Sequence, residues 1–379
     1  MNKREFIQRS CLAAGGIMCL KQTAKMPLEE KPVSGYAKGD KLWKWSKESM
    51  FYEQTPRGTK CLLCPTECTL HEGEMSICRN RVNVDDKLYS IAYGNPCAVH
   101  VDPVEKKPLF HFMPESWSYS IATAGCNFAC LNCQNWTISQ VSPRETRNED
   151  LMPGVVVKAC LSNSCKSISY TYAEPVTFYE YVYDTSRIAR EHGLKNIFIS
   201  NGYINEIPLK NLCKYLDAAN INLKSFSDDT YMRLNSGKLQ PVLDSLKAIR
   251  DSGVWLEITN LVVPNWTDNM DMIRRMCDWL VENGFQSNPL HFLRFQPLYK
   301  LTQLPPTPIS VLYTARETAI KAGINFVYIG NVPGSEGQNT YCPVCKKLIV
   351  ERNGFAITKN YIERNACKFC GTRIEGRWQ

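Results

Sequence analysis

The sequence lacks any hydrophobic run long enough to cross a membrane. No segment of its 379 residues approaches the roughly 18–20 apolar residues that a spanning helix needs. Low-complexity blocks are also missing, and hydrophobic residues make up 44% of the chain against 22% charged residues. This composition excludes a polytopic membrane protein, a collagen and a wholly disordered chain, and it is typical of a globular protein with a real core.

The central part of the chain lacks an excess of positive charge. Lys and Arg outnumber Asp and Glu by 12 to 6 in residues 1–60 and by 8 to 3 in residues 342–379, whereas the 61–341 segment has 25 against 28. A nucleic-acid-binding protein needs a basic stripe on its main body. The sequence therefore predicts no nucleic-acid partner.

The first residues have features of a targeting segment. In MNKREFIQRSCLAAGGIMCL, charged residues precede a weakly apolar run that is too short to span a membrane but fits the core of a signal peptide. The segment KREFI resembles a twin-arginine export motif with Lys3 in place of the first arginine. We expect a signal-like leader at 1–22, for which an amphipathic or disordered leader is the alternative, and a linker at 23–55.

Cysteine is the most informative residue type. Eleven of the 18 cysteines fall into three close groups, and thiols two or three residues apart suit metal ions and clusters better than disulfides. The groups are Cys61, Cys64, Cys68 and Cys78; Cys126, Cys130 and Cys133; and Cys342, Cys345, Cys367 and Cys370.

Between residues 118 and 329 the sequence alternates between strand and helix patterns. Helical segments, several of them followed by glycine, separate the strand candidates, and this alternation indicates an α/β protein with a parallel sheet. The pattern does not distinguish an open doubly wound sheet from a barrel. Strands are expected at 118–123, 167–172, 196–200, 221–226, 255–263, 290–295 and 325–329.

The middle cysteine group directly follows the first of these strands, with the spacing C-x3-C-x2-C. A [4Fe–4S] cluster ordinarily takes four thiolates. Three thiolates in one loop would leave one iron open for a ligand from outside the protein. A zinc site with a distant fourth ligand is the alternative.

The loop GCNFACLNCQN at 125–135 resembles radical S-adenosylmethionine (SAM) enzymes. Further segments resemble one family more closely, the radical SAM protein of the AmmeMemoRadiSam system, which is related to pyruvate formate-lyase activating enzymes. The resemblance runs from about Cys61 to Trp378. It is carried by DPVEKKPLFHF (102–112), YTYAEP (170–175), SNGY (200–203), NLKSF (222–226), LRFQPLY (293–299) and VYIGN (327–331).

This resemblance implies a partial (β/α)6 barrel at 113–335, with the cluster at the carboxyl ends of the strands. A Cys-rich N-terminal module at 56–112 and a zinc-ribbon-like module at 336–379 would flank it. Cys126, Cys130 and Cys133 would hold a [4Fe–4S] cluster at which SAM is cleaved reductively. The resulting 5′-deoxyadenosyl radical would abstract hydrogen from an unknown substrate.

Two other functions remain open at this point: activation of a glycyl-radical enzyme, and a non-catalytic carrier of electrons with several clusters. The resemblance implies an electron donor such as a flavodoxin or ferredoxin, and a Memo-like companion protein. Because SAM and reductants are cytoplasmic, a cytoplasmic location is favoured over export through the leader.

The resemblance also implies which residues bind SAM. Glu174 would bind the SAM amine, since a carboxylate forms a charge-assisted hydrogen bond with an ammonium group. Asn201 ends a strand at the same end of the barrel. Asn222 and Lys224 stand where activating enzymes have Asp-x-Lys.

Three further residues have less certain roles. Glu257 and Arg294 fit either a buried ion pair or a substrate role, and His111 fits a packing residue between two phenylalanines.

The outer cysteine groups have ancillary roles in this interpretation. The C-terminal group is two C-x2-C pairs separated by 21 residues, including a hairpin turned at Asn353-Gly354. This spacing predicts structural zinc, with a second iron–sulfur cluster as the alternative. The N-terminal group, with His71 nearby, fits zinc or an auxiliary cluster equally well, and a group without metal is the third alternative.

Overall fold

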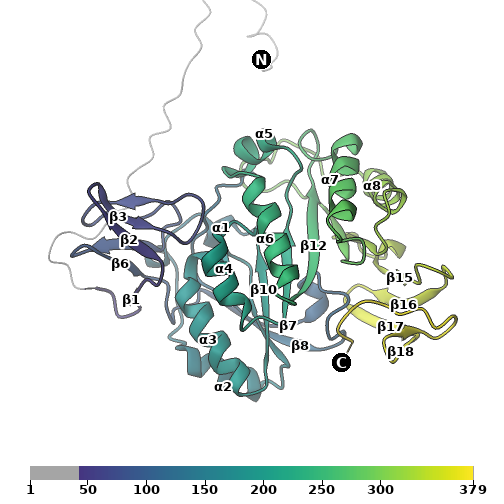
Figure 1. Cartoon of the computed structure of the whole chain (residues 1–379), viewed down its shortest axis with the longest axis horizontal. Helices are drawn as coiled ribbons and strands as arrows, with labels where there is room; N and C mark the ends of the chain where they lie inside the picture. Colours follow the sequence, from purple (N-terminus) through teal and green to yellow (C-terminus); the bar gives the residue numbers. More distant parts are fainter. Residues whose placement is uncertain (1–41, 379) are drawn as a thin grey trace, which may run out of the picture. The chain divides into compact units, whose positions relative to one another are not determined.

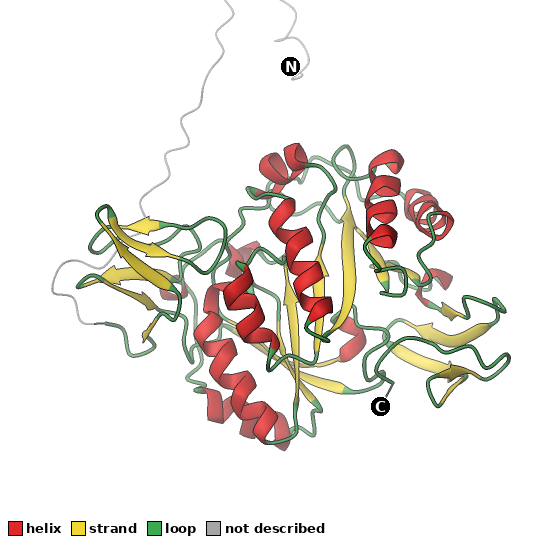
Figure 2. Cartoon of the chain, viewed as in Figure 1, coloured by secondary structure: helices red, strands yellow, loops and turns green. Residues whose placement is uncertain are grey.

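The computed structural model describes residues 42–378 (Figures 1 and 2). Its main feature is an eight-stranded sheet with the order β14-β13-β12-β11-β10-β9-β8-β7. Strands β8 to β14 run parallel to their neighbours, whereas β7 (Ala98–Pro103) pairs antiparallel with β8. The parallel strands are β8 (Trp117–Ala122), β9 (Ser167–Tyr170), β10 (Lys195–Ser200), β11 (Ala218–Asn222), β12 (Trp255–Val262), β13 (Leu290–Arg294) and β14 (Val327–Gly330).

Helices connect the parallel strands. Because the strand order follows the chain order and such crossovers are right-handed, every crossover passes over the same face of the sheet. A doubly wound sheet, in which the order reverses, is therefore excluded. The longer helices are α2 (Pro153–Ser162), α3 (Tyr179–Glu191), α4 (Glu206–Cys213), α6 (Gln240–Asp251), α7 (Met270–Glu282) and α8 (Ile309–Lys321).

Amphipathic patterns explain how these helices pack. In α6 the apolar residues Val242, Leu246 and Ile249 recur at helical spacing, and all three side chains are fully buried. Short helical segments complete the described chain: η1 (Val104–Lys106), α1 (Trp136–Ser139), η2 (Pro143–Glu145), η3 (Pro175–Phe178), α5 (Asp228–Thr230), the π-helical turn η4 (Tyr231–Asn235) and η5 (Glu336–Gln338).

The strand–helix alternation expected from the sequence is confirmed, with two corrections. The parallel part of the sheet has seven strands where the resemblance implied six, because β14 pairs in register with β13. The strand expected at 221–226 is β11, which begins at Ala218 and ends at Asn222. Beyond this end the Lys224 backbone N–H donates to the Tyr231 hydroxyl at 3.0 Å, so it does not extend the ladder to a neighbouring strand.

Two small three-stranded sheets precede β7, with the orders β2-β3-β4 and β1-β6-β5. Part of the segment expected as a linker belongs to them, because β1 pairs with β6 and β2 pairs with β3. A buried ion pair at 2.9 Å joins this module to α3, between Arg81 and Glu180, which are each 1% exposed. The strands are β1 (Lys47–Glu48), β2 (Tyr52–Thr55), β3 (Gly58–Cys61), β4 (Thr69–Leu70), β5 (Arg81–Val84) and β6 (Lys87–Ser90).

The C-terminal module consists of short strands. The expected hairpin is confirmed: β16 (Leu348–Asn353) and β17 (Ala356–Asn360) pair antiparallel, and Gly354 in the turn has a φ of 61°. Phe110 from the segment after β7 packs with Ile349 and Ile374 in a small buried cluster, which attaches the module to the main sheet. The remaining strands are β15 (Thr340–Tyr341), β18 (Ile362–Glu363) and β19 (Ala366–Cys367).

The expected leader at 1–22 lies outside the described residues. Within residues 42–378, no helix is both long and apolar enough to cross a membrane.

Candidate iron–sulfur and SAM site

The candidate site lies where the parallel strands β8 to β11 end. The three-cysteine loop follows β8, Glu174 follows β9, Asn201 follows β10, and Asn222 is the last residue of β11. Because the carboxyl ends of parallel strands meet at one edge of a sheet, these residues gather there, as functional residues commonly do in parallel α/β folds.

The cysteine loop is held by hydrogen bonds from η4. Ala129 N–H donates to the Asn235 carbonyl at 3.2 Å, and Leu131 N–H donates to the Leu234 carbonyl at 2.9 Å. The Asn235 side chain in turn donates to Cys130 Sγ at 3.1 Å. Donors of this kind stabilise a thiolate that ligates a metal and tune the potential of a cluster.

The three thiols are close enough to influence one another but do not form a single-ion site. Burial strongly raises the pKa of Cys126, and the charges of Glu174, Cys130 and Cys133 add to that increase. Buried thiols with raised pKa values stay protonated unless a metal centre replaces their protons. Within residues 42–378, these three thiols are not among the ligand groups placed so that they could hold a single metal ion. The donor set thus fits a multi-iron cluster, whose thiolates bind different irons.

Glu174 is 4% exposed and caps η3. Its Oε1 accepts from Ser200 Oγ at 2.6 Å and from Val176 N–H at 3.1 Å, and its Oε2 accepts from Asn201 N–H at 2.8 Å. Burial nevertheless raises the pKa of Glu174 to about 7, although these donors and the charge of Lys224 oppose the increase. The carboxylate therefore lacks a full counter-charge, which an ammonium group on a ligand would supply.

Asparagines connect the cysteine loop to the strand ends. Asn201 Nδ2 donates to Asn127 Oδ1 at 2.8 Å, and Asn127 Nδ2 donates to the Tyr203 carbonyl at 2.8 Å. Asn222 Nδ2 donates to the Ser200 carbonyl at 3.3 Å. The structure thus brings Asn201 and Asn222 to the same edge as Glu174.

Lys224 lies just beyond the end of β11. Its charge opposes the burial that raises the pKa of both Glu174 and Cys133, so its ammonium group lies near both residues. Within residues 42–378, Lys224 Nζ makes no hydrogen bond or ion pair. It is therefore available to an anionic or polar ligand group.

Two site residues were not found from the sequence. Asn127 lies in the quoted cysteine loop, but nothing in the spacing indicated its bond to Asn201. Asn235 is 105 residues from Cys130 in the chain, and no local pattern signals their contact.

Glu257 and Arg294 do not form the ion pair considered from the sequence. Glu257 is fully buried and accepts from His291 Nε2 at 2.7 Å and from the backbone N–H groups of Phe110 and His111. Arg294 Nε instead donates to the Thr307 carbonyl at 2.9 Å. Glu257 thus pairs with His291 in place of Arg294, and its bonds to the Phe110 and His111 backbone hold the segment that follows β7.

His111 is a buried structural residue, as expected. Its Nε2 lies 2.5 Å from the Tyr328 hydroxyl, and its Nδ1 lies 2.7 Å from the Glu375 carbonyl. Burial lowers the pKa of His111 to about 4, so the ring is neutral near pH 7.

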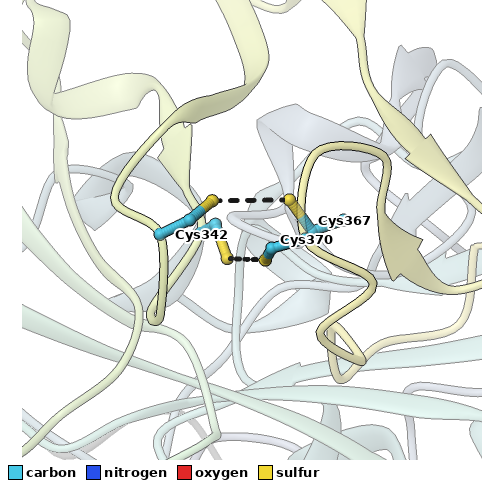
Figure 3. A group of neighbouring side chains, drawn as sticks. Cys342, Cys367 and Cys370 are labelled. Atoms are coloured by element: carbon cyan, nitrogen blue, oxygen red, sulfur yellow. Dashed lines mark hydrogen bonds between the residues drawn. The ribbon is translucent and has the colours of Figure 1, made fainter.

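The C-terminal cysteines meet at one point. All four sulfur atoms lie within 4.8 Å of one another, with 3.6 Å between Cys342 and Cys370 and 3.8 Å between Cys345 and Cys367 (Figure 3). These distances are too long for disulfides, whose sulfurs are about 2.05 Å apart. Tetrahedral Zn–S bonds of about 2.3 Å place sulfurs about 3.8 Å apart. The group can therefore hold one tetrahedral ion.

The N-terminal cysteines lie in the module that packs against the cysteine loop. Cys61 ends β3, Cys64 and Cys68 lie between β3 and β4, and Cys78 precedes β5. Together they line one pocket. His71, which is exposed, is not among the residues that line it.

This fold and loop define the class of the protein. The sequence profile of the radical SAM superfamily matches residues 120–280, which span β8 to most of α7. The chain therefore contains a radical SAM superfamily domain at these residues.

Within that class, the chain belongs to the same family as an uncharacterized protein of Methanocaldococcus jannaschii. The two are 46% identical over 332 residues, which cover 87% of this chain and 99% of the relative. Pyruvate formate-lyase 1-activating enzyme of Escherichia coli strain K12 is 26% identical over 164 residues, which cover 42% of this chain and 67% of that enzyme. A crystal structure of Streptococcus suis SuiB bound to S-adenosylmethionine matches 60% of this chain and 53% of its own, with 15% identity and a TM-score of 0.44.

Proposed function

We propose that this protein is a radical SAM enzyme that cleaves SAM reductively and abstracts hydrogen from a substrate. The observation that carries the proposal is the three-cysteine loop at the carboxyl edge of the sheet, directly beside Glu174 and Lys224. A [4Fe–4S] cluster bound by Cys126, Cys130 and Cys133 would supply the electron that converts SAM to methionine and a 5′-deoxyadenosyl radical.

The chain's own residues have distinct roles in this proposal. Glu174 binds the SAM ammonium group through a charge-assisted hydrogen bond, and Ser200 and Asn201 hold its carboxylate in place. Lys224 neutralises negative charge beside Cys133. Asn201 and Asn222 offer amide groups to polar parts of SAM. The sheet, as a partial barrel, shields the radical from water and side reactions.

The family within the radical SAM enzymes to which we assign this protein is also a proposal. The quoted segments support a radical SAM protein of the AmmeMemoRadiSam system, acting with a Memo-like companion and reduced by a flavodoxin or ferredoxin. Activation of a glycyl-radical enzyme is the second candidate, favoured by the similarity to pyruvate formate-lyase 1-activating enzyme. A pure electron carrier explains neither the unpaired Lys224 ammonium group nor the buried Glu174 carboxylate. We place the enzyme in the cytoplasm, with export as the alternative.

We also propose that Cys342, Cys345, Cys367 and Cys370 bind structural Zn2+ in a zinc-ribbon-like module. The sulfur–sulfur distances of 3.6 and 3.8 Å support one tetrahedral zinc ion. A [4Fe–4S] cluster would attach each thiolate to a different iron and would spread the sulfurs further apart.

The test is anaerobic reconstitution followed by addition of dithionite and SAM. Wild-type protein is expected to yield 5′-deoxyadenosine and methionine, and Cys130→Ala is expected to yield neither. Cys97→Ser is the matched control, because Cys97 is a free, partly buried cysteine outside the three groups. Absence of 5′-deoxyadenosine from wild-type protein with an intact, reduced cluster would contradict the proposal.

A further inference from the structure

The N-terminal cysteines share one pocket with residues of the α/β domain that carries the candidate SAM site. Its lining includes Arg81 from β5, Asn127 from the cysteine loop, and Thr177 from η3. The four cysteines complete it: Cys61, Cys64, Cys68 and Cys78. Four cysteines that line one pocket can supply a complete ligand set for a metal centre.

The arrangement of these thiols differs from that of the C-terminal group. Electrostatic interactions link every pair of the four thiols, so all four lie near one another. Yet within residues 42–378 the C-terminal group alone has three or more ligand atoms placed so that they could hold a single metal ion. The N-terminal thiols, although near one another, are therefore not arranged as a site for one tetrahedral zinc ion.

Arg81, which lines this pocket, has a buried hydrogen-bond donor without a partner. Arg81 is 1% exposed, and its terminal nitrogens bond to Glu180 at 2.9 Å and Ser49 at 2.5 Å. Its Nε–H has no partner among residues 42–378. The positive charge of Arg81 lowers the pKa of Cys61, while burial dominates and raises it to about 12. A buried donor beside thiols suits the sulfur atoms of an iron–sulfur cluster.

We infer that Cys61, Cys64, Cys68 and Cys78 hold an auxiliary [4Fe–4S] cluster that passes electrons to the SAM-cleaving cluster. Because four cysteines ligate all four irons, this cluster has no open position for SAM. Its chemistry is one-electron transfer. The metal site does not depend on the proposed function, whereas the electron relay does.

The two cysteine loops are in direct contact. A Cβ atom at Gly125, the residue before Cys126, would lie 2.5 Å from the Cys78 carbonyl oxygen and 2.4 Å from Asn80 Oδ1. Gly125 also has a φ of 101°, so only glycine fits this approach without strain. Cys78, a proposed ligand of the auxiliary cluster, thus contacts Gly125, which directly precedes the cluster ligand Cys126.

The proposed electron relay consists of two one-electron transfers, first to the auxiliary cluster and then to the SAM-cleaving cluster. A low-potential protein donor of the ferredoxin or flavodoxin class loses one electron and reduces the auxiliary cluster from its 2+ to its 1+ state. The auxiliary cluster then returns to 2+ as the cluster at Cys126, Cys130 and Cys133 gains that electron. No proton or further co-reactant is required.

Metal content tests the site. Anaerobically prepared full-length protein is expected to hold about eight irons, and the Cys126→Ala, Cys130→Ala, Cys133→Ala triple variant about four, with an EPR signal upon reduction. Adding Cys64→Ser and Cys68→Ser to the triple variant should remove these irons and the signal, whereas Cys97→Ser should leave the wild-type iron count unchanged. About four irons in wild-type protein, or zinc in place of iron in the triple variant, would overturn the auxiliary cluster.

The source of the electron tests the relay. The Cys64→Ser, Cys68→Ser variant, with its SAM-cleaving cluster intact, is expected to form 5′-deoxyadenosine with dithionite but to lose most of that activity with reduced flavodoxin. Equal activity of variant and wild type with flavodoxin would overturn the relay. If wild-type protein forms no 5′-deoxyadenosine with either reductant, the proposed function and the relay fail together, while the iron count still decides whether the auxiliary cluster exists.

Discussion

Replacing Glu174 by glutamine removes one negative charge from the proposed SAM site while keeping the size of the side chain. A hydrogen bond to a charged group contributes about 1.5–3 kcal/mol, so losing it should weaken SAM binding roughly 10- to 150-fold. The dissociation constant is measured by anaerobic calorimetry on reconstituted protein, together with the iron content of each variant.

The structure adds a second effect of this substitution. Each carboxylate oxygen of Glu174 accepts from a backbone N–H, of Val176 on one side and of Asn201 on the other. Either orientation of a glutamine amide therefore sets its NH2 group against a backbone donor. An unsatisfied buried donor costs about 1–3 kcal/mol, so the free energy of unfolding should fall by that amount.

Two control variants separate charge from local packing. Ser200→Ala removes the 2.6 Å hydrogen bond to the same carboxylate but keeps the charge, so SAM affinity should change far less. Glu105→Gln changes a buried glutamate near the end of β7 that has one unpartnered oxygen, and SAM affinity should not change. The reasoning is refuted if Glu174→Gln binds SAM as wild type does with its cluster intact, or if Ser200→Ala weakens binding equally.

Two further substitutions test the other parts of the molecule. Cys345→Ser is expected to remove about one zinc per chain and to make the last ~40 residues sensitive to protease, because such small modules fold on their metal; a full zinc content would contradict this, and the EPR spectrum of the Cys126 cluster should be unchanged. Asp102→Asn should lower the free energy of unfolding by about 3–5 kcal/mol at pH 7, because it breaks a buried pair with Lys107. Burial raises the pKa of Asp102, but hydrogen bonds from Lys106, Lys107 and Tyr172 outweigh it and lower the pKa below its usual 3.8. The stability from Asp102 is thus present above pH 3.8 and lost as the pH falls below it, so the two urea-unfolding curves should converge in acid. The exposed pair of Asp150 with Lys44 provides the control, since water screens this pair and Asp150→Asn should leave the stability almost unchanged.

Much of the fold could be predicted because its signals are local. Apolar residues at helical spacing, such as Val242, Leu246 and Ile249, indicated α6, and Asn353-Gly354 indicated the hairpin of β16 and β17. The end of β11 was missed because Leu223 continues the apolar alternation of Ala219 and Ile221 beyond the strand. Only the contact of Lys224 N–H with Tyr231 ends the ladder there.

Other errors involved pairings between distant segments. Residues 47–48 were expected in a linker, because a two-residue strand has no pattern of its own until β6 pairs with it. Glu257 has a histidine partner rather than Arg294, since the register of β12 on β13 decides which side chains meet.

The sequence by itself determined the chemistry that depends on spacing along the chain: three thiols in one loop after a strand, two C-x2-C pairs, and strands alternating with helices. Tertiary structure alone decided which groups meet across the chain. It brought Asn235 to Cys130, set Cys78 against Gly125, and left the Arg81 Nε–H beside the N-terminal thiols. It also distinguished the two four-cysteine groups, because within residues 42–378 only the C-terminal group has its sulfur atoms close enough together for a single metal ion. These differences depend on contacts between residues that are distant in the chain. Packing and strand register decide such contacts, and no periodic pattern in the sequence indicates them.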